Sequence, residues 1–205
     1  PLGLVQLSPD TGNGSWDYCS GYQFNDTTLL GFSHTHLSGG GNADLGDIQM
    51  LPFSDKKTIE GNAVAFSKVR EHASPGYYST LLTDDQIQVE LTASERTGMH
   101  RYIFNNEGER NVLVNIEKIL WSFGSPLRGQ TNEAELVVEN NYRISGSYNT
   151  NARTYREIYF AIQFEQVFNE TIFLNDTIKN RLVLKFARNE SDTIIARVAI
   201  STVSI

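Results

Sequence analysis

Cysteine, long apolar runs and clustered positive charge are the scarcest features of this 205-residue sequence. The single cysteine, Cys19, excludes an intrachain disulfide but leaves the cellular compartment open, because many periplasmic proteins also lack disulfides. No apolar run approaches about 18 residues, so the sequence contains no candidate membrane-spanning helix. The 17 basic residues are scattered among 24 acidic ones, and no basic run could follow a phosphate backbone, which argues against a nucleic-acid partner.

A helical repeat of apolar residues is also missing, and alternation with period two takes its place. The strongest stripe is every second residue from Ile158 to Phe164, and turn residues such as those at 74–76 separate the stripes. Many short strands joined by turns predict an all-β fold: a large, supersandwich-like, antiparallel two-sheet β-sandwich with little helix. The other predicted strands are 4–7, 48–53, 77–82, 87–93, 100–104, 112–116, 134–139, 142–148, 182–186 and 195–201.

Both ends of the sequence are strand-like, at 1–5 and again at 199–205. Natural termini are usually polar and frayed. No linker, internal repeat or low-complexity tract divides the chain. We therefore expect residues 1–205 to form one domain of a longer protein.

Residues suited to binding concentrate in the segments 16–22 and 31–41, which combine aromatic rings, two histidines, hydroxyls and glycines. Flat rings cover the C–H faces of a sugar, while short polar groups and closely approaching backbone bind its hydroxyls. This mixture is typical of a polyol-binding surface. Small and acidic neighbours, including Asp17, favour partial exposure of Trp16 at such a site, whereas Tyr22 suits a site and the core equally well.

His34 and His36 are two residues apart on a predicted strand, so their imidazoles share a face and allow three interpretations. They could ligate a metal, but a metal needs three or four ligands, and no motif connects them with His72 and His100. They could be structural, with hydrogen bonds inside the domain. They could also line a sugar or interface pocket, where a neutral imidazole both donates and accepts.

Glycines follow the histidines in the run Ser-Gly-Gly-Gly at 38–41. The run lacks the Gly-Lys-Ser/Thr ending of a phosphate-binding loop. We interpret Gly39 and Gly40 as positions where backbone approaches a ligand or a facing domain. Asp44 and Asp47 come next, and turn carboxylates that cap backbone N–H groups explain them more economically than catalysis does.

Catalytic residues are not apparent. Glycoside hydrolysis needs a pair of carboxyl groups, and none of the 24 acidic residues stands out as an acid or a base. No activating histidine is specified for Cys19, so we expect a buried, inert thiol, and we expect Trp121 in the core. A sugar-contacting surface without a catalytic pair indicates that the pair lies elsewhere.

Several of these segments are similar to the N-terminal domain of glycoside hydrolase family 92. The most specific is the run Gly-Phe-Ser-His-Thr-His-Leu-Ser-Gly at 31–39. The glycine-rich stretch 39–43 and the turn 107–110 depart from the family pattern. The other similar segments are 3–11, 20–22, 44–48, 73–78, 90–98, 100–102 and 198–204.

The resemblance implies a calcium-dependent exo-α-mannosidase that acts with inversion, in many members on α-1,2-linked mannose of N-glycans or yeast mannan. It implies a β-sandwich here and a following (α/α)6 barrel, absent from this sequence, that carries the general acid, the base and most calcium ligands. No catalytic or metal-binding residue is therefore expected in this chain. Its partners would be its own catalytic domain and α-mannoside glycans, and its location would be periplasmic, extracellular or on the cell surface.

The resemblance also implies that the sandwich forms one wall of the active site, with Trp16 stacked on the leaving-group sugar. His34, His36 and the glycine run would lie at or near the domain interface. The isolated domain is expected to be inactive. A free-standing glycan-binding module and a structural domain without ligand contact remain as alternatives. The predicted substrate-binding residues are Trp16, Asp17, Tyr22, His34, His36, Gly39 and Gly40.

Overall fold

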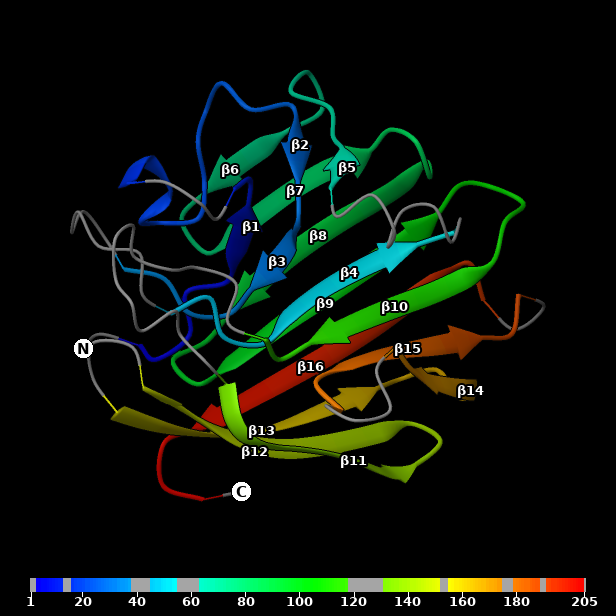
Figure 1. Cartoon of the computed structure of the whole chain (residues 1–205). Coiled ribbons are helices and arrows are strands. Elements are labelled where there is room, and N and C mark those ends of the chain that lie inside the picture. The colour runs from blue at the N-terminus through cyan, green and yellow to red at the C-terminus, as the bar shows by residue number, and fades with distance from the viewer. Residues whose placement is uncertain are drawn as a thin grey trace.

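The computed structural model describes residues 3–12, 16–37, 45–54, 63–117, 131–151, 155–174, 179–188 and 191–204. Within these ranges every strand pair is antiparallel. A six-stranded sheet lies in front of an eight-stranded sheet in the view of Figure 1. This arrangement confirms the predicted antiparallel two-sheet sandwich.

The six-stranded sheet has residues 8–10 and 31–33 at one edge, next to the segments that the sequence marks as sugar-binding. Its strand at 110–115 is buried along its whole length, because neighbouring strands flank it on both sides and the other sheet covers one face. The strands are, in spatial order, β1 (Ser8–Asp10), β3 (Gly31–Ser33), β4 (Gln49–Phe53), β10 (Arg110–Asn115), β15 (Arg181–Phe186) and β14 (Phe168–Phe173).

The eight-stranded sheet forms the second layer. In spatial order its strands are β11 (Thr131–Asn140), β12 (Arg143–Asn151), β13 (Tyr155–Phe164), β16 (Thr193–Ser201), β9 (Thr97–Phe104), β8 (Ile87–Ala93), β7 (Tyr77–Leu82) and β6 (His72–Ser74).

Short elements complete the described fold. The strands β2 (Thr28–Leu29) and β5 (Val64–Ala65) form a small ribbon, and a bridge between Phe66 and Leu82 joins it to the eight-stranded sheet. A single 3-10 helix, η1 (Trp16–Tyr18), is the only helix among the described residues. No helix in the described ranges has the length and apolar character needed to cross a membrane.

The core lies between the two sheets and follows the predicted alternation. Ile158, Phe160, Ile162 and Phe164 of β13 are at most 2% exposed, and each such side chain stabilises the fold by roughly 1.5–3 kcal/mol through burial. The structure corrects one predicted strand, because residues 4–7 form none. Their backbone instead bonds to two different partners: the Leu4 N–H donates to Glu95 O, and the Gln6 N–H to His34 O.

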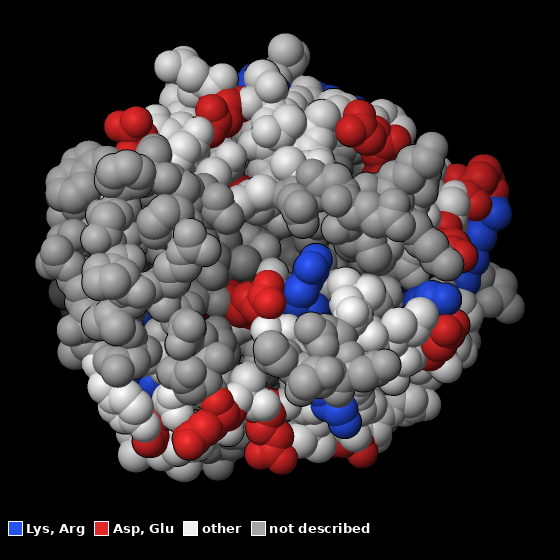
Figure 2. All heavy atoms as spheres, viewed as in Figure 1, with Lys and Arg blue, Asp and Glu red and all other residues white. Residues whose placement is uncertain are grey.

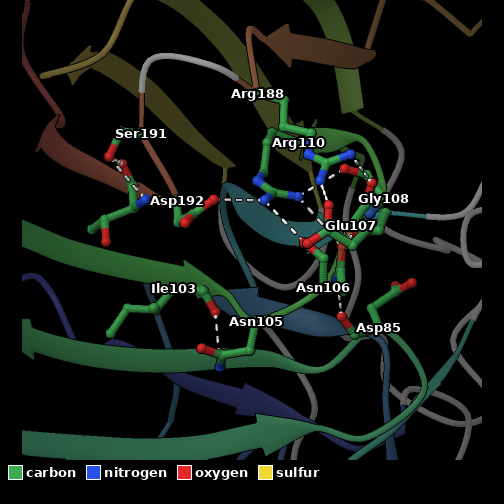
Figure 3. Close-up of polar contacts among 12 residues, drawn as sticks. Asp85, Ile103, Asn105, Asn106, Glu107, Gly108, Arg110, Arg188, Ser191 and Asp192 are labelled. Atoms are coloured by element: carbon green, nitrogen blue, oxygen red, sulfur yellow. Dashed lines mark hydrogen bonds and ion pairs between the residues drawn. The ribbon is translucent and has the colours of Figure 1, made fainter.

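A buried arginine connects the two sheets at the first residue of β10, next to the end of β4 (Figure 3). Arg110 donates to the carbonyl oxygens of Gly108 (2.7 Å) and Asn106 (3.0 Å). It also pairs with Asp192, at 2.7 Å, just before β16. Its guanidinium lies 5.1 Å from the centre of the Phe104 ring. The unusual turn at 107–110 therefore has a structural role in holding the sandwich closed.

Candidate functional site

The two segments that the sequence marks as sugar-binding are in contact where the structure describes them. Gly21 has a φ of 80°, and a Cβ on it would lie 2.6 Å from Asp10 Oδ1 and 2.8 Å from His36 Nε2. These distances exclude a side chain, and the positive φ also favours glycine. The aromatic turn, defined here as residues 16–24, therefore packs directly on the histidine segment, defined as residues 33–37.

Backbone hydrogen bonds close the base of the aromatic turn. The Thr11 N–H donates to Gly21 O at 2.7 Å, and the Gln23 N–H donates to Thr11 Oγ1 at 2.8 Å. The Gln23 side chain bonds to the carbonyl oxygen of Asp17. These bonds fix the path of η1, which leaves the exposed Asp17 at the surface of the described chain.

Tyr22 holds the aromatic turn against the segment between β5 and β6. Its hydroxyl donates to Glu71 Oε2 at 3.0 Å and accepts from Lys68 Nζ at 2.6 Å. The same ammonium lies 4.6 Å from the centre of the Tyr22 ring, and Glu71 also accepts a bond from Tyr78. Burial and Glu71 raise the pKa of Tyr22 despite the opposing effect of Lys68. The hydroxyl is thus a neutral donor already committed inside the chain.

His36 lies between two acceptors in the interior. Its Nδ1 is 2.7 Å from the carbonyl oxygen of Gln6, and its Nε2 is 2.8 Å from Asp10 Oδ1. The Asp10 carboxylate also accepts bonds from Ser33 Oγ (3.0 Å) and Gln49 Nε2 (2.8 Å). Burial lowers the pKa of His36, but the bond to Asp10 and its negative charge outweigh burial and raise the pKa overall.

His34 begins a second buried chain of hydrogen bonds. Its Nδ1 is 2.6 Å from the Ile48 carbonyl oxygen, which can only accept, so Nδ1 carries a proton. Its Nε2 then accepts from His100 Nε2 at 3.0 Å, and the Tyr102 hydroxyl donates to His100 Nδ1 at 2.7 Å. Burial lowers the pKa of His34 to about 4 and that of His100 well below its ordinary value. Both rings are therefore neutral.

Asp47 ties together the residues on either side of the segment 38–44. It accepts from Thr35 Oγ1 at 2.6 Å, and its own N–H donates to that oxygen at 2.9 Å. The Tyr148 hydroxyl of β12 donates to the other carboxylate oxygen at 2.8 Å. Among the described residues, Asp47 thus accepts from the hydroxyls of Thr35 and Tyr148, and Arg156 Nη2 lies 3.7 Å from its Oδ1. That Asp47 caps backbone N–H groups stays a prediction.

The backbone after residue 44 is strained. Leu45 has a φ of 80° and Ile48 a φ of 52°, in a region that branched side chains rarely occupy. Each such residue costs about 1–3 kcal/mol and persists only where its surroundings fix it. The hydrogen bond from His34 to the Ile48 carbonyl supplies part of that restraint. Strain of this kind concentrates at functional sites.

The described residues thus separate the predicted site into a surface part and a buried part. Asp17 is exposed and Tyr22 partly buried, whereas His34 and His36 are 0% and 6% exposed. Because both histidines are buried, they would act on a ligand bound at the surface through the residues that they contact. The side chain of Trp16, together with Gly39, Gly40, Asp44 and Trp121, lies outside what the structure describes. Substrate binding by the predicted residues stays a prediction, while Cys19 is buried as expected.

The partners of the histidines could not be identified from the sequence. Asp10 lies 26 positions from its partner His36, and His100 lies 66 positions from its partner His34. Both fall in segments that resemble family 92, 3–11 and 100–102, but that resemblance does not show which histidine each one contacts. Among the described residues, no group of three or more His, Cys, Asp or Glu side chains could hold a metal ion.

A groove of about 560 Å³ runs between the segment 3–8 and the strands β7 and β8. Two tyrosines, Tyr77 and Tyr78, line it together with Thr92, Ser94 and Glu95. On the face shown in Figure 2, acidic and basic side chains are scattered among the described residues, and an acidic and a basic side chain lie side by side near the centre.

The antiparallel sandwich and its sequence motifs are those of a glycoside hydrolase domain. Residues 1–201 match the glycosyl hydrolase family 92 N-terminal domain, and the chain belongs to this family. The comparison with curated proteins gives no match.

Solved structures of the family share the fold. The GH92 alpha-mannosidase BT3965 from Bacteroides thetaiotaomicron, in complex with mannoimidazole, is 27% identical with a TM-score of 0.86, over 100% of this chain and 30% of that one. The inverting mannosidase BT2199 from Bacteroides thetaiotaomicron VPI-5482 is 20% identical with a TM-score of 0.78, over 100% of this chain and 28% of that one. The chain therefore spans less than a third of the length of these enzymes.

Proposed function

We propose that this chain is the non-catalytic N-terminal domain of an inverting, calcium-dependent exo-α-mannosidase, with α-1,2-linked mannosides as substrates. In this proposal the aromatic turn contributes the leaving-group side of the active site. Family membership supports the reaction class. The observation that carries the site is the packing of Gly21 on His36 and Asp10, because it brings together the two segments that the sequence marks as sugar-binding.

The division of labour follows from inverting chemistry. The general acid and the general base stand about 6.5–9.5 Å apart, with a water between base and sugar. We assign both groups and the calcium site to an (α/α)6 barrel outside this chain; calcium would orient the water and help distort the mannose ring. The sandwich supplies binding energy for the leaving-group sugar, which selects the linkage. We place the enzyme in the periplasm, at the cell surface or outside the cell, where it would take part in N-glycan degradation.

Substitution of Trp16 by alanine in the enzyme that contains this domain tests the proposal. Loss of a stacking ring costs roughly 0.5–1.5 kcal/mol beyond buried area, so KM for α-1,2-mannobiose should rise about fivefold. KM for an aryl mannoside without a leaving-group sugar should stay unchanged. Tyr142→Ala is the matched control, because Tyr142 is an exposed aromatic in the turn between β11 and β12. Lower stability with unaltered KM values would favour a purely structural domain.

A second experiment uses residues 1–205 alone. The proposal expects no mannoside hydrolysis by this domain, and detectable hydrolysis would overturn it.

The groove beside β7 favours one alternative, a glycan-binding module that acts on its own. Its rings and hydroxyls suit a neutral sugar. Calorimetric titration of residues 1–205 with α-mannosides separates the two functions. Binding that Tyr77→Ala weakens and Trp16→Ala does not would support the module.

A further inference from the structure

The ring of His36 faces oxygen acceptors on both sides. The Gln6 carbonyl opposite Nδ1 can only accept, and so can the Asp10 carboxylate opposite Nε2. Ser33 Oγ lies 3.0 Å from Nε2, but its proton is committed to Asp10, so it too can only accept from the ring. Ser8 Oγ lies 3.1 Å from Nδ1 and its hydroxyl can donate or accept, but the Gln6 carbonyl oxygen is closer, at 2.7 Å, and can only accept. A neutral imidazole would leave one lone pair facing the Gln6 or the Asp10 oxygen, so the geometry favours a proton on each nitrogen.

We propose that His36 is a positioning residue, an imidazolium at neutral pH whose buried ion pair with Asp10 sets the aromatic turn against the histidine segment. This inference rests on the proposed function, and it names the residues that position the leaving-group wall. It also replaces the expected neutral, ligand-lining imidazole with a charged, internal one.

Both members of the pair are removed from water, with side chains 4% and 0% exposed. The pair therefore persists only with its full set of hydrogen bonds, which the neighbouring side chains and the Gln6 carbonyl provide. Two other titratable side chains act on His36. The charge of Asp47 raises the pKa of His36, and the neutral His34 ring adjoins it in the sequence.

The ion pair of His36 and Asp10 is joined to the aromatic turn by hydrogen bonds of Thr11 and by the packing of Gly21. The residue after Asp10, Thr11, bonds to Gly21 O and to the Gln23 N–H. Gly21 itself rests on Asp10 Oδ1 and His36 Nε2. A lost or shifted imidazolium thus removes the surface on which the turn is seated. A change in the buried pair should therefore shift the exposed end of the turn.

Nuclear magnetic resonance tests the protonation state directly. Segmental labelling of this domain with ¹⁵N-histidine in the intact enzyme gives signals from only four histidines. We expect one of them, lost in His36→Gln, to show two protonated ring nitrogens at neutral pH, and two others to show neutral rings. A His36 ring with one unprotonated nitrogen at neutral pH overturns the proposal, whatever the activity of the enzyme.

Kinetics test the positioning role. We expect His36→Gln and Asp10→Asn each to raise KM for α-1,2-mannobiose about tenfold, with kcat on an aryl mannoside within about twofold of the parent. The double variant should be no worse than the single ones, because the residues act as a pair. KM for mannobiose in the parent should also rise at alkaline pH, where His36 deprotonates. His72→Gln, at an exposed histidine of β6, is the matched control and should change nothing.

The outcomes separate this inference from the proposed function. An imidazolium with unaltered KM values in His36→Gln overturns the positioning role. Equal losses on both substrates, in proportion to the loss of folded protein, also overturn it, since they show a structural role alone. If Trp16→Ala leaves KM unchanged while the imidazolium is observed, the proposed function fails and the ionic state stands. If the variants do not fold, the resonance measurement on the parent still decides the protonation, with His36 assigned by elimination from the other three histidines.

Discussion

Acid should destabilise this chain through the buried pair of His34 and His100. Each ring is neutral in the folded state, with every ring nitrogen engaged as donor or acceptor. Protonation of His34 would place its Nε2–H opposite the Nε2–H of His100. Protonation of His100 would place its Nδ1–H opposite the Tyr102 hydroxyl, which now donates to that nitrogen. In the unfolded chain both rings have the ordinary histidine pKa of about 6.5. Between the folded and unfolded pKa values the unfolded state holds more protons, so stability falls as pH falls.

The size of the effect follows from the pKa of His34, which burial lowers from 6.5 to about 4. At 1.36 kcal/mol for each pKa unit, the free energy of unfolding should fall by about 3 kcal/mol between about pH 7.5 and pH 4 from this residue alone. His100 shifts in the same direction and adds to the loss. His36 acts in the opposite direction near neutrality, because its raised pKa keeps the folded ring protonated while the unfolded ring still loses its proton near pH 6.5. Well below pH 6.5 the ring is protonated in both states, and His36 adds no slope there.

Urea unfolding at a series of pH values measures the effect. The parent chain and His34→Gln should be compared, because the difference between their free energies removes the contribution of other titrating groups. The parent should start more stable near neutrality, and the two curves should converge by about 3 kcal/mol on acidification. Parallel curves would refute the assignment of His34 as a buried neutral imidazole.

Three further outcomes are expected. Gly98→Ala should destabilise the chain by about 2 kcal/mol in thermal unfolding, because its Cβ would lie 2.6 Å from a ring carbon of the fixed His34; an unchanged midpoint would contradict this packing. Arg110→Met should cost about 3 kcal/mol by leaving buried carbonyl oxygens unpaired, whereas Asp192→Asn should cost under about 1 kcal/mol because that carboxylate is 69% exposed. The Cys19 thiol should react with a disulfide reagent about 100-fold more slowly in folded than in urea-unfolded protein, and equal rates would show that it is accessible.

Much of the fold could be predicted because alternation is a local property. Every second residue from Ile158 to Phe164 is buried, and the strand at 77–82 has the predicted limits. The segment 4–7 has the same alternation but forms no strand, since its backbone bonds to Glu95 on one side and His34 on the other. No local pattern distinguishes a strand from an extended segment with divided partners.

The site could be predicted only in part, because its location depends on local motifs and its chemistry on distant contacts. The aromatic turn and the histidine segment were identifiable, and they do meet at Gly21. Their interior partners were not, since His34 and His100 are separated by 66 positions and Asp47 and Tyr148 by 101. Charge state also depends on those contacts: two histidines two residues apart have pKa values displaced in opposite directions.

The sharing of one carboxylate by Ser33, His36 and Gln49 has an evolutionary consequence. A lineage that replaced the imidazole first would retain a stranded negative charge in a dry interior, which is strongly disfavoured. Neutral drift through single replacements is therefore blocked at these positions. Relatives that have abandoned the ion pair should have exchanged both members together, and their covariation would record the coupling across divergent lineages.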